Sequence, residues 1–124
     1  MMPYGQMRMD AMLTLLTALI AAAPVAVPHG PVPSNDARQW VTNADYPIRS
    51  LAGLQEGVVQ VRLPVNRNGE VDQCAVGISS GWPELDQNTC LLIATRARFH
   101  PARNARGQRI AGEVVQRIRW TIPR

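Results

Sequence analysis

Residues 57–69 read GVVQVRLPVNRNG and combine a strand pattern with a turn pattern. Apolar residues alternate with others over 59–65, and this period of two is typical of a half-buried strand. Asn68-Gly69 is a strong signal for a hairpin turn. Pro64 cannot donate a backbone hydrogen bond, so we expect it to face an unpaired edge or a bulge. The segment therefore predicts two strands of an antiparallel sheet joined by a tight turn.

The return strand is expected over residues 71–78. Its apolar positions Val71 and Cys74 are out of phase by one residue. We expect a β-bulge near Asp72 and Gln73 to repair the phase, and Cys74 then points into the core.

A helix and a last strand follow. Pro83 suits a first helical position, and Pro101 marks the end of the helix. Apolar positions then alternate with polar ones over 110–122. The helical stripe that should face the sheet consists of Leu85, Thr89, Ile93 and Ala97. The prediction is an α+β domain with a small antiparallel three-stranded sheet, in the order β-β-α-β, and a helix packed on one face.

The N-terminal part of the chain has the layout of an export signal. Arg8 precedes an apolar run over 11–27, which shifts to small residues before Pro24. We assign residues 1–29 to a signal peptide, with an uncleaved membrane anchor as the alternative. A proline-rich spacer is expected over 30–43, and the folded domain over 44–124. The chain is therefore expected to be exported, either free or held in a membrane by the retained leader.

Export bears on the two cysteines, Cys74 and Cys90. An oxidising compartment favours a disulfide between them. Two buried thiols or a metal site are the alternatives, but no His or acidic ligands stand at suitable spacing. We expect a structural disulfide and no metal ion.

The chain has 124 residues and a net charge of +4, with arginine as its only basic residue apart from histidine. The arginines near the C-terminus could form a basic patch for nucleic acid, but export makes that partner unsuitable and leaves anionic lipid or an acidic peptide. His29 and His100 have no nucleophile or carboxylate at motif spacing. We predict no catalytic residues, no cofactor and no enzymatic activity. Ser79-Ser80-Gly81 could hold an anion through backbone amides, although a plain strand-to-helix turn is the simpler interpretation.

The last strand remains as a candidate binding surface. A sheet this small has exposed edges, which charged residues such as Arg117 and Arg119 protect from aggregation. The same edge can accept an extended peptide as an added strand. The residues of this candidate edge are Val114, Val115, Gln116, Arg117, Ile118, Arg119, Trp120, Thr121 and Ile122.

Several short motifs occur in a fixed order along the chain. They are Tyr46-Pro47, Gly57-x-Val59-x-Val61-x-Leu63-x-Val65, Asn68-Gly69-x-Val71, Ser79-Ser80-Gly81, Leu85-Asp86, Arg98-Phe99-x-Pro101-Ala102 and Gly107. Together they resemble the C-terminal domain of TonB energy transducers. The interval from Asp86 to Phe99 is one residue longer than is usual in that family, and the cysteine pair is not a general family feature.

The resemblance implies a function and partners. Domains of this family lie in the periplasm and bind the Ton-box peptide of outer-membrane transporters by strand addition at the last long strand. Their transducers are anchored in the inner membrane and work with an ExbB–ExbD proton channel. Because the spacer here is short, we expect a stand-alone binding domain. A structural envelope protein that self-associates through the same edge, as a homodimer, is the alternative.

Overall fold

The computed structural model describes residues 26–124. The predicted leader, residues 1–29, lies almost wholly outside this range and stays a prediction. The elements, in chain order, are β1 (Val32–Pro33), η1 (Ala37–Gln39), η2 (Asn43–Asp45), α2 (Ile48–Ala52), β2 (Gly57–Val65), β3 (Ala75–Ile78), α3 (Pro83–Arg96), β4 (Phe99–His100), β5 (Ala102–Arg103), β6 (Arg109–Ile110) and β7 (Gly112–Trp120).

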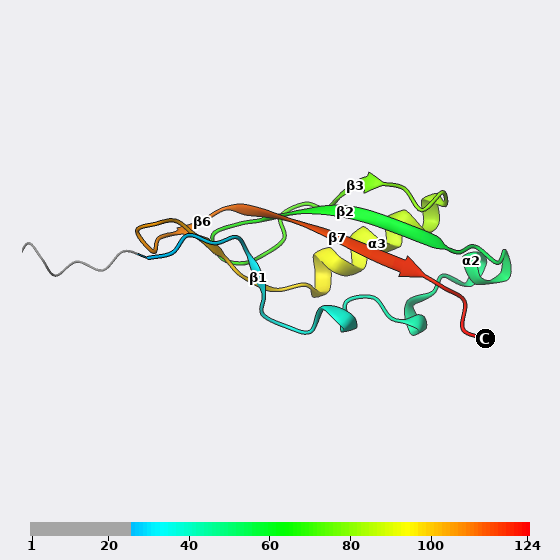
Figure 1. Ribbon diagram of the computed structural model, residues 1–124. Coiled ribbons are helices and arrows are strands. Elements are labelled where there is room, and N and C mark those ends of the chain that lie inside the picture. The colour runs from blue at the N-terminus through cyan, green and yellow to red at the C-terminus, as the bar shows by residue number, and fades with distance from the viewer. Residues whose placement is uncertain (1–25) are drawn as a thin grey trace, which may run out of the picture.

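The three main strands form one antiparallel sheet in the order β3-β2-β7. Helix α3 lies along one face of this sheet (Figure 1). Two short strand pairs, β1 with β4 and β5 with β6, extend the domain at one end. The predicted α+β class and the β-β-α-β order are confirmed, and the short pairs are additions that the sequence did not predict.

The core lies between the sheet and α3. All four apolar side chains of the period-two pattern in β2 are at most 1% exposed. The helical stripe of Leu85, Thr89 and Ile93 is fully buried against them, as the helical spacing predicted. The other large members of the core are Trp40, Tyr46, Phe99 and Trp120.

The turn after β2 confirms the hairpin prediction. Gly69 has a φ of +82°, and its N–H donates to the carbonyl of Asn66 at 3.0 Å. A side chain at this position would meet the carbonyl of Phe99, whose N–H donates to the Gly69 carbonyl at 3.0 Å. Glycine is therefore required both by the left-handed backbone and by the close approach of the segment after α3.

The return strand is shorter than predicted. Only Ala75–Ile78 form β3, and an isolated bridge pairs Val71 with Val65. The pairs Val71 with Val65 and Ala75 with Arg62 place three residues, 72–74, opposite two residues of β2, so the return segment has one extra residue where the bulge was predicted. A second register shift lies between Gln60 and Val61 of β2. Ladder pairing with β2 begins at Ala75, so Pro64 lies beyond the end of β3. Pro64 has no N–H to donate, and it can occupy the central strand β2 because β3 does not extend alongside this position.

The disulfide between Cys74 and Cys90 is present and ties the start of β3 to α3. Both cysteines pack against the core. Cys90 follows the buried Thr89 in α3 and lies on the side of the helix that faces the return segment. The predicted pairing is therefore confirmed.

Residues of the predicted spacer also contact the domain. Trp40 is 1% exposed, and its Nε1 donates to Oδ1 of Asn35 at 2.8 Å. Its ring centroid lies 5.4 Å from that of Phe99. A tryptophan buried in this way belongs to the core, so the segment before residue 44 contributes to folding stability.

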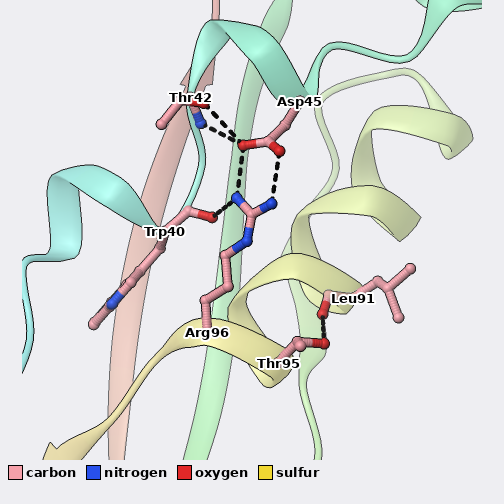
Figure 2. Close-up of polar contacts among 6 residues, drawn as sticks. All are labelled: Trp40, Thr42, Asp45, Leu91, Thr95 and Arg96. Carbon is pink, nitrogen blue, oxygen red and sulfur yellow. Dashed lines mark hydrogen bonds and ion pairs between the residues drawn. The ribbon is translucent and has the colours of Figure 1, made fainter.

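An ion pair fastens the same segment to the end of α3 (Figure 2). The Arg96 guanidinium donates to both carboxylate oxygens of Asp45, at 2.7 and 2.8 Å, and to the carbonyl of Trp40 at 3.0 Å. Thr42 adds its backbone N–H at 2.8 Å from Asp45. Hydrogen bonds from Arg96 lower the pKa of Asp45 to about 2.

Replacement of Asp45 by asparagine is expected to lower the free energy of unfolding by about 1–2 kcal/mol at pH 7, after allowance for solvent screening. The folded-state pKa lies below the ordinary value, so this contribution is present above about pH 4 and is lost as the pH falls towards 2. Urea unfolding of protein and variant between pH 7 and 2.5 measures it. In the described part of the chain, the exposed Asp36 forms an ion pair with its neighbour Arg38 alone, so the matched Asp36→Asn variant should show a much smaller loss. A stability difference for Asp45→Asn that does not change with pH would contradict the assignment.

Candidate functional site

Strand β7 forms one edge of the sheet. In the described residues 26–124, β2 is its only partner, over the full register from Gly57 with Trp120 to Val65 with Gly112. The other long edge of β7 is not covered by any strand of this part of the chain (Figure 1). The strand that the sequence predicted as an edge is therefore an edge.

The predicted strand over 110–122 divides in two. Ala111 separates β6 from β7, and β7 ends at Trp120. Thr121 and Ile122 lie beyond the strand, and the Ile122 N–H donates to Oε1 of Glu56 at 2.9 Å. Of the nine predicted edge residues, the seven from Val114 to Trp120 therefore lie within the strand.

Backbone hydrogen bonds around Pro64 show which residues of β7 present free groups. The Pro64 carbonyl accepts from Asp72 at 3.1 Å, and the Asn66 N–H donates to the Glu70 carbonyl at 2.9 Å. The N–H and C=O of one residue point to the same edge of a strand and alternate along it. The backbone N–H and C=O groups of even-numbered β2 residues therefore point towards the return segment, and those of odd-numbered residues point towards β7.

The alternation continues across the ladder into β7. The odd-numbered residues of β2 pair with even-numbered residues of β7, which thus use their N–H and C=O within the sheet. The residues whose backbone groups point to the free edge are Glu113, Val115, Arg117 and Arg119. Three of these four, Val115, Arg117 and Arg119, belong to the predicted edge. The register with β2 is what distinguishes them from the neighbouring residues whose backbone groups bond to β2.

Side chains along β7 follow the same period. Val114, Gln116 and Ile118 are half-buried on the helix side, and the odd-numbered residues are exposed. Trp120 is 3% exposed and donates from Nε1 to Oγ1 of Thr89 at 2.8 Å. The apolar and polar faces are those that the alternation predicted, and the buried Trp120 anchors the end of the strand.

The Ser79–Gly81 turn has a structural role. The Ser80 N–H and Oγ donate to Asp86 at 2.9 and 2.7 Å, and the Ser79 hydroxyl donates to the same carboxylate. Burial alone raises the pKa of Asp86, but these hydrogen bonds outweigh it and hold the pKa below its ordinary value. The Gly81 N–H donates to Oγ of Ser79 at 2.9 Å, so the Ser80 and Gly81 amides that could have held an anion already have partners within the domain. The sequence showed Asp86 only as an acidic residue in the first turn.

Two surface hollows adjoin the turn after β2, and the larger has a volume of about 490 Å³. Asn66, Arg67 and Arg109 line both. Neither is lined by His100 or by an acidic residue. In residues 26–124, no group of three or more His, Cys, Asp or Glu side chains is arranged to hold a metal ion.

The fold and the edge together define the class of the domain, a small α+β domain with a helix on one face of the sheet and one long strand edge open. The family model described as "Gram-negative bacterial TonB protein C-terminal" matches residues 42–122, about two thirds of the chain. The chain belongs to this family. In the comparison with curated proteins, no protein matched the chain.

Family membership indicates a TonB-like role in TonB-dependent transport, in the envelope of a Gram-negative cell. The family is a non-enzymatic one, and its members interact with outer-membrane transporters. None of the helices in the part that the structure describes is long and apolar enough to span a membrane.

Proposed function

We propose that this chain is a periplasmic binding domain that engages Ton-box-like peptides of outer-membrane transporters by strand addition to the free edge of β7. The observation that carries the proposal is a nine-residue strand edge, unpaired within residues 26–124, in a domain of the TonB C-terminal family. Backbone hydrogen bonds to the outward groups of β7 would provide affinity, and neighbouring side chains would provide specificity. If the leader is retained as an anchor, an ExbB–ExbD complex becomes a second partner.

A stand-alone structural protein that self-associates is the alternative. Antiparallel pairing of two β7 strands over their full length would place Arg119 of one copy opposite Glu113 of the other, and Arg117 opposite Val115. Opposite charges that face each other across a strand pair are stabilising. Peptide binding and the oligomeric state must therefore both be measured.

A proline at position 115 tests the proposal. Val115 points its N–H to the free edge, so the Val115→Pro variant removes one donor for an added strand and leaves the ladder to β2 intact. We expect Ton-box peptide affinity to fall at least tenfold, measured by NMR titration of the purified, disulfide-bonded protein. The matched variant Val115→Thr keeps both the N–H and the β-branched shape, and it should bind as the unmodified protein does.

Two outcomes would count against strand addition. Equal affinity of Val115→Pro and Val115→Thr would exclude the β7 edge as the binding site. A concentration-dependent dimer that does not respond to peptide, measured by sedimentation, would favour the self-associating alternative.

A further inference from the structure

The second face of the sheet carries arginine, and no helix of residues 26–124 covers it. Helix α3 covers only one face (Figure 1). On the other face Arg117 stands opposite Gln60, and Arg119 stands opposite Val58. Arg62 lies on the same face, opposite Val115. All three arginines are exposed.

Among residues 26–124, these three charges have no carboxylate partner. The ion pairs formed within residues 26–124 involve other arginines. Glu56, the acidic residue closest in register to Arg119, bonds to Arg124 at 3.2 Å and to the Ile122 N–H. Glu113 stands at the far end of β7, opposite Pro64. Neighbouring like charges on one sheet face are unfavourable, and a bound anion would offset that cost.

Odd-numbered residues of β7 supply both the free backbone groups of the edge and the arginine side chains of the open face. Arg117 and Arg119 direct their backbone groups to the free edge and their side chains to the open face. In a strand added to β7, every second side chain lies on that face, with Cβ atoms about 4.5–5.5 Å from those of the residues directly opposite. Two carboxylates at positions i and i+2 of the peptide would therefore lie beside the two guanidinium groups.

The helix side of β7 favours a different residue type. Val114 and Ile118 are half-buried there and pack against the core. A peptide side chain at position i+1 lies on this side, where an apolar residue would extend the buried surface. The edge thus presents a positive row on one face and an apolar row on the other.

We propose that β7 selects extended peptides with an acidic–apolar–acidic alternation, and that Arg117 and Arg119 are the residues that determine this specificity. The inference rests on the proposed strand addition and adds the chemical class of the peptide.

Three synthetic peptides of equal length test it. The first, Ser-Glu-Val-Glu-Val-Thr-Ser, places both carboxylates on one face of a strand. The second, Ser-Glu-Glu-Val-Val-Thr-Ser, has the same composition and charge but divides the carboxylates between the faces. The third, Ser-Gln-Val-Gln-Val-Thr-Ser, is neutral. We expect the first to bind about tenfold more tightly than the third in low salt, and the second to gain threefold at most.

Protein variants locate the effect. Replacing both Arg117 and Arg119 by glutamine should remove the preference for the first peptide, so that the first and third peptides bind this variant with equal affinity. The control, with Arg67 and Arg106 replaced by glutamine, has the same net charge and should keep the preference. Equal loss in both double variants would show that general charge attraction is responsible, and would overturn the inference.

The two proposals fail differently. If the peptides protect the outward amides of β7 with equal affinity, the specificity inference is wrong and strand addition stands. If no peptide protects those amides at millimolar concentration, strand addition itself is wrong, and the specificity inference falls with it.

Discussion

Replacing Trp40 by alanine is expected to lower the free energy of unfolding by about 3–5 kcal/mol. The side chain is 1% exposed, and its ring packs on Phe99 with centroids 5.4 Å apart. Truncation removes this packing, leaves a cavity, and deprives Asn35 of the hydrogen bond from Nε1. Because a domain of this size is marginally stable, much of the folded population would be lost near 37 °C.

Trp82 provides the matched control for this variant. Its side chain is 40% exposed, and its Nε1 donates to the Glu56 carbonyl at 3.1 Å. The Trp82→Ala variant should lose about 1 kcal/mol or less. Urea unfolding followed by circular dichroism measures both. A loss below 1 kcal/mol for Trp40→Ala would show that the segment before residue 44 is not part of the folding unit.

Removing the disulfide is expected to cost about 3 kcal/mol in the chain-entropy model, for a loop that closes between Cys74 and Cys90, 16 residues apart. The bond joins the irregular segment before β3 to the helix. Few strand hydrogen bonds hold the return segment to β2, because β3 contains only four residues. Without the disulfide, we therefore expect residues 71–78 to detach from β2 first.

The test compares the oxidised protein with a variant in which both cysteines are alanine. A reducing agent should destabilise the unmodified protein by a similar amount and leave the double variant unchanged. Thiol titration under denaturing, non-reducing conditions checks the starting state. Two free thiols in protein purified from the periplasm would contradict the oxidised assignment.

Short-range patterns predicted the main elements well. The alternation in β2, the stripe of Leu85, Thr89 and Ile93, and the Asn68-Gly69 turn are properties of a few consecutive residues. Each pattern reports which face of one element is buried. For the same reason the alternation in β7 assigned its faces correctly.

Contacts between distant residues could not be predicted in this way. Asp45 and Arg96 are separated by 51 residues, and the sequence places Arg96 only at a helix end, where cations are favoured in any case. Trp40 follows a proline-rich stretch, so nothing local showed that it would reach the core. The length and the buried face of the return strand were predicted wrongly, because its apolar residues do not all face inwards: Val76 and Ile78 are 43% and 58% exposed.

The candidate site was predicted as a strand, but its bonding pattern was not. Which residues of β7 have free N–H and C=O groups depends on the register with β2, and a shift by one residue would reverse it. Arg62 was also missed, because only that register brings it onto the face that carries Arg117 and Arg119.

Amide hydrogen exchange along β7 is the most direct test of strand addition. The protein is followed with and without a saturating Ton-box peptide, residue by residue. We predict that exchange of the N–H groups of Val115, Arg117 and Arg119 slows at least tenfold on binding. The N–H groups of Val114, Gln116 and Ile118, already bonded to β2, should change much less. Uniform slowing along the whole strand, or no change at the three outward amides, would contradict the proposed binding mode.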